Sequence, residues 1–265
     1  MNLQYLITST IVAVFILLNA QPSHAEKLFA GFYDWCPYTC NPDKTNGNKG
    51  YIVEIIEAAY NESEFKVELS YKPYARLLLE LKHGRIDIIA GATREESTPF
   101  LVPTLNQGFS VSSFFSFHPS ISLTQPRIIK TSSKIAIVNG YEYNSPLFDQ
   151  IKKTAADRIF SISGDGAYER IFTLLTLGRL DFVHDDIRAM RYYIDQLGYS
   201  GLVNQSHEND PHTPIYIPFS AKSISAQRAL EWFNEIYPSL IKSGKIDRIL
   251  SKYEISSEEF DYTQY

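Results

Sequence analysis

Hydrophobic residues along the chain follow two spacings that alternate. Apolar residues three and four positions apart predict amphipathic helices, and these segments are residues 50–60, 74–83, 146–154, 166–177, 187–197, 225–242 and 245–253. Short alternating or continuous apolar runs predict strands, and these runs are residues 28–33, 65–70, 86–90, 134–138 and 180–184. Strands that alternate with helices are typical of an α/β fold with parallel sheets, which bind ligands at the carboxyl ends of their strands.

One short motif occurs twice in this pattern. Residues 81–88 and 175–182 both read as the end of a helix, a Gly-Arg turn and a strand. The repeat favours two lobes that are built alike. The alternative is that the motif is only a common junction between a helix and a strand.

Two extended segments separate the repeated units. They are residues 107–117, rich in Ser and Phe, and residues 213–220. If both cross between the lobes, the chain contains one discontinuous lobe and one continuous lobe. We therefore expect residues 26–110 with 214–265 to form the first lobe and residues 111–213 to form the second.

The beginning of the chain has the character of a secretory signal. The first 25 residues lack Lys, Arg, Asp and Glu, and residues 7–18 are almost wholly apolar, which is the length of a signal core and short for a membrane span. Small residues at Ser23 and Ala25 match a cleavage site. We expect cleavage after Ala25 and a periplasmic protein. An uncleaved membrane anchor is the alternative, because the first residues carry no basic side chain.

Composition narrows the range of partners. The net charge is −5 and the basic residues are scattered, whereas a nucleic-acid partner requires a clustered cationic face. The 18 Tyr and 16 Phe hint at an aromatic-lined site, although packing in the core explains most such rings equally well. The His residues are dispersed without metal-ligand spacing, so we expect neither a metal nor a cofactor.

The two cysteines, Cys36 and Cys40, are separated by three residues that include Pro37. In an exported chain this setting favours a disulfide, because the proline presets a turn that brings the two residues within bridging distance. Metal binding is the weaker alternative, since two thiolates fall short of a four-ligand site. The spacing also differs from the C-x-x-C of redox-active pairs.

Taken together, these motifs resemble the family 3 extracellular solute-binding proteins, which feed amino-acid ABC importers. The resemblance covers nearly the whole chain after the signal. It rests on the order and spacing of the segments Asp34-Trp35-Cys36-Pro37-Tyr38, Gly50-Tyr51-Ile52-Val53-Glu54, Lys72-Pro73-Tyr74-Ala75-Arg76, Gly84-Arg85-Ile86-Asp87, Val138-Asn139-Gly140-Tyr141, Gly178-Arg179-Leu180-Asp181 and Ser243-Gly244-Lys245-Ile246-Asp247-Arg248. It implies a type II periplasmic-binding-protein fold, with two α/β lobes joined by two hinge crossings and closing on a ligand.

The resemblance also implies ligand-binding residues in the first lobe. Trp35 falls where the family places an aromatic ring against the ligand, and Tyr74 falls on a second wall. Gly91 and Thr93 lie on the loop after the third strand, where backbone groups and small hydroxyls contact the ligand. The alternative for Trp35 and Tyr74 is packing within the core of the lobe.

In the second lobe the resemblance implies contacts from Asn139, Tyr141 and Glu142 in the loop after a strand. Asp186 stands at the spacing at which amino-acid receptors of the family hold the ammonium of the ligand. Its alternative role is to cap the helix over residues 187–197, a position that Asp commonly occupies.

One feature departs from the family pattern. Amino-acid receptors carry an Arg several residues beyond the Thr of the first-lobe loop, and its planar fork binds the ligand's carboxylate. Here residues 97–99 are Ser, Thr and Pro. Arg76 or Arg94 could substitute out of register, although Arg76 could instead pair with Glu80 one turn away. The departure puts an ordinary amino acid in doubt as the ligand.

The expected function is therefore a monomeric receptor that captures a small polar solute, an amino acid or related compound, and delivers it to a membrane ABC permease. Motifs of hydrolases, zinc proteases and phosphate-binding loops are missing from the sequence. The same fold also hosts periplasmic dehydratases, in which Glu142 or Asp186 could serve as a general acid. A ligand-sensing module is a further alternative.

Overall fold

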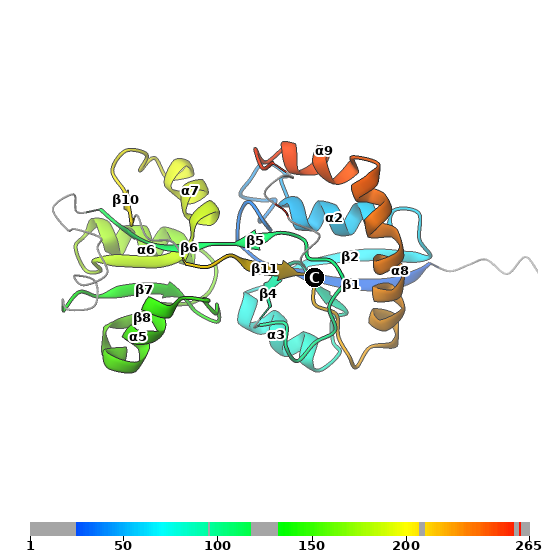
Figure 1. Cartoon of the computed structure of the whole chain (residues 1–265), viewed down its shortest axis with the longest axis horizontal. Coiled ribbons are helices and arrows are strands. Elements are labelled where there is room, and N and C mark those ends of the chain that lie inside the picture. The colour runs from blue at the N-terminus through cyan, green and yellow to red at the C-terminus, as the bar shows by residue number, and fades with distance from the viewer. Residues whose placement is uncertain (1–24, 95, 118–131, 207–209, 257–259, 261–265) are drawn as a thin grey trace, which may run out of the picture.

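The computed structural model describes residues 25–94, 96–117, 132–206, 210–256 and 260. It shows two lobes side by side, joined by extended segments that run between them (Figure 1). The predicted signal segment lies outside the described residues except for Ala25.

Lobe 1 is built on two three-stranded sheets, with strand orders β2-β1-β3 and β4-β11-β5. Its strands are β1 (Glu26–Phe32), β2 (Phe65–Tyr71), β3 (Ile88–Ile89), β4 (Ala92–Thr93), β5 (Phe109–Ser110) and β11 (Thr213–Tyr216). Its helices are α2 (Tyr51–Tyr60), α3 (Tyr74–Lys82), α8 (Ile224–Lys242) and α9 (Lys245–Ser251). Strand β1 pairs in parallel with β2 and β3, as the alternation of strands and helices predicts.

Lobe 2 has one five-stranded sheet of order β10-β6-β9-β7-β8. Its strands are β6 (Ser112–Ser116), β7 (Ile135–Val138), β8 (Ile159–Ile162), β9 (Phe182–Asp186) and β10 (Asn204–Gln205). Its helices are α5 (Pro146–Thr154), the short η1 (Ala156–Arg158), α6 (Ala167–Thr176) and α7 (Ile187–Gln196). Strand β7 is parallel to β8 and β9, whereas β6 is antiparallel to β9 and β10.

Side-chain caps set where several helices begin. The Ser145 hydroxyl accepts from the N–H of Phe148 at 3.1 Å at the start of α5, and Ser223 accepts from Ala226 at 3.2 Å at the start of α8. Each cap satisfies an N–H that has no partner within its own helix. Most helix boundaries lie within one or two residues of those predicted from the apolar spacing.

The last parallel strand of lobe 2 lies later in the chain than the apolar run predicts. The run over residues 180–184 corresponds to β9, which covers Phe182–Asp186. Its pairing with β6 extends to Asp185 and Asp186, and both carboxylates are buried. Because Asp is rarely buried in full, Asp185 and Asp186 indicate from sequence that the strand has already ended. In the structure, pairing with β6 extends the strand through both residues. Strand β8, which is partly exposed, was not predicted.

Two crossings join the lobes, and in the first both backbone groups of Val111 are hydrogen-bonded. The chain leaves β5, which pairs with β11 in lobe 1, and enters β6 of lobe 2 through Val111. The Val111 carbonyl accepts from the N–H of Ile187 at 2.8 Å, and its N–H donates to Asp186 Oδ2 at 3.1 Å. The chain returns through Asp210, whose N–H donates to the carbonyl of Ser112 at 2.9 Å, and enters β11.

The helices near the end of the chain pack on lobe 1, beside α2 (Figure 1). The Tyr60 hydroxyl donates to the carbonyl of Ala229 in α8 at 2.7 Å. The indole Nε1 of Trp232 donates to the carbonyl of Ala59 at 2.8 Å. Lobe 1 is therefore discontinuous in sequence, and its last helices fix the outer face of α2.

Candidate functional site

The interlobe cleft begins with a short turn that a disulfide closes. Cys36 and Cys40 are bonded to each other and fully buried, which confirms the predicted bridge. Within the turn, the N–H of Trp35 donates to the Thr39 carbonyl at 2.9 Å. These links fix the backbone beside Trp35, whose indole stacks on the Tyr38 ring with centroids 4.0 Å apart.

Aromatic rings from both lobes meet in the cleft. Tyr33, Trp35 and Tyr74 belong to lobe 1, and Tyr141 comes from the loop after β7 in lobe 2. Tyr141 makes edge contacts with all three lobe 1 rings, with centroids 5.4–6.1 Å apart. Tyr33 lies 4.5 Å from Tyr74. We call these four residues the aromatic wall, and the electron-rich faces of such rings attract cations.

Two residues of the aromatic wall carry polar atoms that lack a hydrogen-bond partner within 3.5 Å in the described part of the chain. Trp35 and Tyr74 are each only 4% exposed, and the indole Nε1 and the Tyr74 hydroxyl are the atoms concerned. A buried polar group without a partner costs about 1–3 kcal/mol, and such groups are rare away from functional sites. They mark the cleft as a place where a further molecule can complete the hydrogen bonding.

Glu96 links the two lobes beneath this wall. Its Oε2 accepts from the N–H of Thr93 at 2.7 Å and from the Thr93 hydroxyl at 2.9 Å. Its Oε1 accepts from the N–H of Glu142, in lobe 2, at 3.0 Å. Burial raises the pKa of the Glu96 carboxyl even though these hydrogen bonds oppose the rise. A nearby positive charge would therefore be favoured at this position.

Asp185, at the end of β9, is the most strongly perturbed carboxyl of the cleft. It is 1% exposed, and its Oδ1 accepts from the N–H of Asp186 at 2.7 Å. Its Oδ2 has no hydrogen-bond partner within 3.5 Å among the described residues, although Tyr168 lies near enough to favour the charged form. Burial raises the pKa of Asp185 to about 8, and the adjacent Asp186 carboxylate adds to the rise.

Asp186 is also buried, but its oxygens are fully occupied. Oδ1 caps α7 by accepting from the N–H of Ala189 at 2.9 Å. Oδ2 accepts from the Tyr38 hydroxyl at 3.0 Å, from Ser110 Oγ at 2.8 Å and from the N–H of Val111 at 3.1 Å. The predicted alternative role, capping of the helix, is present in the structure. Asp186 also connects lobe 2 to Val111 of the first crossing and to Tyr38 of lobe 1.

Two cavities lie between the lobes. The inner chamber has a volume of about 20 Å³ and is lined by Tyr33, Trp35, Thr93, Glu96, Ser110, Ser112, Tyr141, Glu142, Tyr143, Asp185 and Asp186. The outer chamber has a volume of about 310 Å³ and is lined by Tyr33, Asp34, Tyr71, Pro73, Tyr74, Ala75, Arg76, Val138, Asn139, Tyr141, Ser163, Gly164, Asp165, Ala167 and Tyr168. Tyr33 and Tyr141 line both chambers.

Most residues that the sequence singled out lie in or beside these chambers. The inner chamber contains Trp35, Thr93, Tyr141, Glu142 and Asp186, and the outer chamber contains Tyr74, Arg76, Asn139 and Tyr141. Gly91 lies beside Trp35 and has a φ of +88°, so any residue with a side chain would be strained there. A Cβ added to it would also lie 2.9 Å from the Ile52 side chain. The Gly91 carbonyl accepts from the Tyr33 hydroxyl at 3.1 Å.

Neither of the two arginines considered for a ligand carboxylate lines the inner chamber. Arg76 is 68% exposed in its side chain, and its Nε lies 2.9 Å from Glu80 Oε1 one turn along α3. The Arg94 guanidinium lies over the Tyr216 ring, 5.2 Å from its centroid, and lines neither chamber. No Lys, Arg or His is among the described residues that line the inner chamber.

The sequence did not single out Tyr33, Glu96, Asp185, Tyr143, Ser110 or Ser112 as site residues, although all six line the inner chamber. The acidic pair Asp185-Asp186 was a usable signal, because two adjacent carboxylates directly after an apolar strand need a reason for burial. Glu96 gave a weaker signal, since it stands within a charged loop that reads as solvent-exposed.

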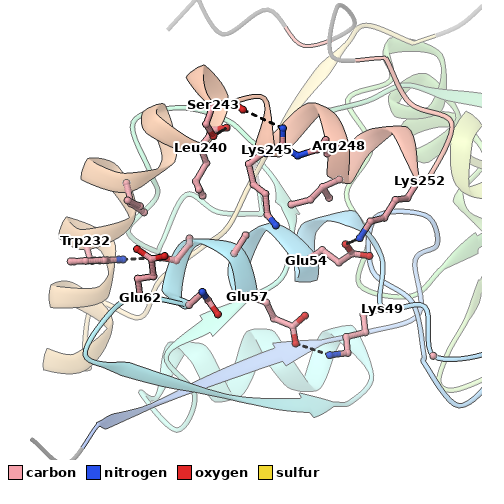
Figure 2. A pocket seen from close by; sticks show the side chains of 16 residues that line it. Lys49, Glu54, Glu57, Glu62, Trp232, Leu240, Ser243, Lys245, Arg248 and Lys252 are labelled. Atoms are coloured by element: carbon pink, nitrogen blue, oxygen red, sulfur yellow. Dashed lines mark hydrogen bonds and ion pairs between the residues drawn. The ribbon is translucent and has the colours of Figure 1, made fainter.

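A groove of about 800 Å³ on the outer face of lobe 1, between α2, α8 and α9, is larger than either chamber (Figure 2). Four of its charged side chains pair with one another, with Lys49 2.6 Å from Glu57 and Lys252 2.6 Å from Glu54. The Trp232 indole donates to a carbonyl of α2. Because these polar groups are satisfied within lobe 1, the interlobe chambers are the better candidate for a ligand site.

Neither a membrane crossing nor a metal centre is evident in the described part of the chain. None of its helices combines the length and apolar character that a membrane crossing needs. No group of three or more His, Cys, Asp or Glu side chains among those residues is arranged to hold a metal ion.

Comparison with solved structures places this fold among known ones. The Salmonella typhimurium periplasmic binding protein described for its high arginine specificity is 16% identical, with a TM-score of 0.66, 86% of this chain and 99% of that chain covered. A putative L-cystine ABC transporter protein from Listeria monocytogenes is 16% identical, with a TM-score of 0.71 and coverage of 91% and 100%. The protein EhuB, in complex with hydroxyectoine, is 14% identical, with a TM-score of 0.73 and coverage of 89% and 91%.

These likenesses confirm the predicted type II periplasmic-binding-protein fold. No curated protein matches the chain in sequence. The sequence pattern of the bacterial extracellular solute-binding proteins, family 3, however, matches residues 29–256. The two-lobed fold, the interlobe chambers and this match lead to one conclusion: the chain belongs to the family 3 bacterial extracellular solute-binding proteins.

Proposed function

We propose that this solute-binding protein captures a small solute with a positively charged nitrogen between its lobes and delivers it to a membrane ABC importer. The single observation that carries the proposal is the lining of the inner chamber. Four carboxyl side chains and four aromatic rings meet there, and no basic side chain does so among the described residues.

The chemistry of this lining suits a cation for two reasons. Aromatic faces attract an ammonium or guanidinium group by about 0.5–2 kcal/mol. The carboxylates of Glu96 and Asp185, whose pKa values burial raises, gain a partner when a cation enters. A negatively charged solute would instead add repulsion to a buried acidic site.

The positions of Arg76 and Arg94 also support this choice. Recognition of a ligand carboxylate usually uses an arginine fork, but Arg76 pairs with Glu80 and Arg94 covers Tyr216. Among related folds, the Salmonella typhimurium protein binds arginine with high specificity, and arginine carries a cationic guanidinium. An α-carboxylate is thus less important here than the cationic end.

In this proposal the chain acts in the periplasm as a monomer, after removal of a signal peptide by cleavage following Ala25. It binds its solute without chemical turnover and contacts the permease, and it has no nucleic-acid partner. The dispersed basic residues and the net charge of −5 support the last point, because a nucleic-acid site needs a basic patch.

We expect amines and guanidines to raise the melting temperature of the oxidised protein, because a ligand that binds only the folded state stabilises it by mass action, about 2.7 kcal/mol at a hundredfold excess over Kd. The panel comprises alkylamines, guanidines and quaternary ammonium ions, with alcohols of the same length as neutral controls and carboxylates as anionic controls. Thermal shift and calorimetry provide the measurement. Tighter binding of the carboxylates or alcohols than of the amines would overturn the proposal.

Replacing Glu96 with glutamine is expected to weaken binding of the best amine at least tenfold, since the variant keeps the shape of the side chain and removes its charge. Glu62→Gln is the matched control, because Glu62 is exposed on the outer face of lobe 1. The change in Kd, measured by calorimetry, separates the two variants. Equal affinities in both would show that Glu96 does not face the cation.

A further inference from the structure

Tyr33 and Tyr141 line both interlobe chambers. The inner chamber, at about 20 Å³, has room for roughly one water molecule. The outer chamber, at about 310 Å³, falls at the lower end of the range for small-molecule sites. A solute whose cationic end reaches the inner carboxylates must therefore extend past Tyr33 and Tyr141 into the outer chamber.

Tyr141 is the side chain best placed to move aside. It follows Gly140, whose φ is +89°, on a loop of lobe 2, whereas the other rings of the aromatic wall belong to lobe 1. Its hydroxyl donates to the Asp34 carbonyl at 3.4 Å, near the limit for a hydrogen bond. A turn of this ring would open a path between the two chambers.

The outer chamber has carboxylates of its own. Asp34 Oδ1 accepts from the Tyr193 hydroxyl at 2.7 Å, and burial raises the pKa of Asp34. Asp165 Oδ1 accepts from Lys44 Nζ and from the Tyr71 hydroxyl, each at 2.9 Å. Lys44 Nζ also lies 3.6 Å from Asp34 Oδ2. Lys44 therefore pairs with both carboxylates of the outer chamber, Asp34 and Asp165.

Two buried hydroxyls in the outer chamber lack hydrogen-bond partners within 3.5 Å in the described structure. They belong to Tyr74, 4% exposed, and Tyr168, 1% exposed. Each also lies near an inner-chamber carboxyl and lowers its pKa, Tyr74 that of Glu96 and Tyr168 that of Asp185. Both line the chamber, and a phenolic oxygen can accept from an N–H group. Arg76 is the one basic residue among the described lining residues, and its guanidinium is paired with Glu80. The outer chamber thus offers acceptors to a second cationic group.

We propose that the solute carries two cationic nitrogens joined by an aliphatic chain, as in an α,ω-diamine. One nitrogen lies between Glu96 and Asp185, and the other lies in the outer chamber near Asp34 and Asp165, where it competes with Lys44. The aliphatic chain packs along Tyr33, Tyr74 and Tyr141. This inference rests on the proposed function, because it takes the inner chamber as the site of the first cation.

The test compares matched monoamines and diamines of four to six carbons, from n-butylamine and 1,4-diaminobutane to n-hexylamine and 1,6-diaminohexane, by calorimetry on the oxidised protein. The diamine of optimal length is expected to bind at least tenfold more tightly than the monoamine of that length. Asp165→Asn should reduce the diamine affinity to that of the monoamine and leave the monoamine unchanged. Glu96→Gln should weaken both.

Lys44→Ala is the control for the contact between the lobes. It breaks the same Lys44–Asp165 pair as Asp165→Asn but keeps the carboxylate and removes its competitor, so diamine affinity should stay equal or rise. If both variants weaken diamines alike, Asp165 acts through the interlobe contact and the two-ended site is wrong.

The remaining outcomes also decide between the proposals. If monoamines bind as tightly as diamines and Glu96→Gln still weakens them, the inner cation site stands and the second site is overturned. If ω-amino acids such as 6-aminohexanoate bind more tightly than the diamines, the outer chamber holds an anion, and the second site is again wrong. If no amine binds, the proposed function itself fails.

Discussion

Replacing Asp186 with alanine is expected to lower the free energy of unfolding by about 3–5 kcal/mol, and the melting temperature by roughly 10 °C. The substitution removes the acceptor for the N–H groups of Ala189 and Val111 and for the hydroxyls of Tyr38 and Ser110. Each buried donor left without a partner costs about 1–3 kcal/mol, and water can replace some of the lost bonds. Thermal and denaturant unfolding provide the measurement.

The control for this substitution is Asp195→Ala, on the exposed end of the same helix, for which we expect a change of less than about 0.5 kcal/mol. The family resemblance predicts a different result, in which Asp186→Ala unfolds like the parent but loses its affinity for the solute. An unchanged melting temperature with at least tenfold weaker binding would support that ligand role and contradict the structural one.

The affinity for a monoamine such as n-pentylamine is expected to rise about tenfold per pH unit between pH 6 and pH 8. The cation binds best to the ionised Asp185, whose pKa in the free protein is about 8. Below that pH the bound state must release the proton, which costs free energy, whereas the amine stays charged throughout. Above pH 8 the affinity should level off. Calorimetry in several buffers measures both the affinity and the proton released.

Asp185→Asn is expected to remove this pH dependence and to bind the amine at least tenfold more weakly at pH 8, because the variant cannot ionise. Asp149→Asn, on the exposed surface of α5, is the matched control and should keep the slope. A pH profile that is flat in the parent protein, or equally steep in Asp185→Asn, would exclude Asp185 as the group that meets the cation.

The same carboxyl gives the protein without solute an opposite pH dependence. The pKa of Asp185 is about 8 in the folded protein and about 3.9 in an unfolded chain. The folded state therefore holds a proton that the unfolded state has lost between these values, and stability falls as the pH rises from about 4 to 8. Asp185→Asn should flatten this decline, which unfolding curves at pH 5 and pH 8 would show.

Much of the fold could be predicted because local signals agreed with the tertiary structure. Apolar spacing gave most of the helices and parallel strands, with most helix boundaries within one or two residues of those observed. The turn around Pro37 gave the disulfide. These features depend on neighbours in sequence, so one chain is enough to reveal them.

The two buried carboxyl residues of the inner chamber, Asp185 and Glu96, could not be predicted in the same way. Asp185 and Glu96 are polar residues that read locally as the end of a strand and as an exposed loop. Their burial arises only when β6 pairs with β9 and when the Glu142 loop of lobe 2 meets lobe 1. For Arg76, the i,i+4 spacing offered pairing with Glu80 as an alternative to a ligand role, and the structure shows that pair.

The placement of the two tryptophans has an optical consequence. Trp35 lies inside the cleft, stacked on Tyr38 and 4% exposed, whereas Trp232 lies on the outer groove of lobe 1. Because indole emission depends on its immediate surroundings, Trp35 is a fluorophore built into the candidate site, and Trp232 is a constant background. A Trp232→Phe chain would then report the filling of the cleft through a single emitter, with no label attached.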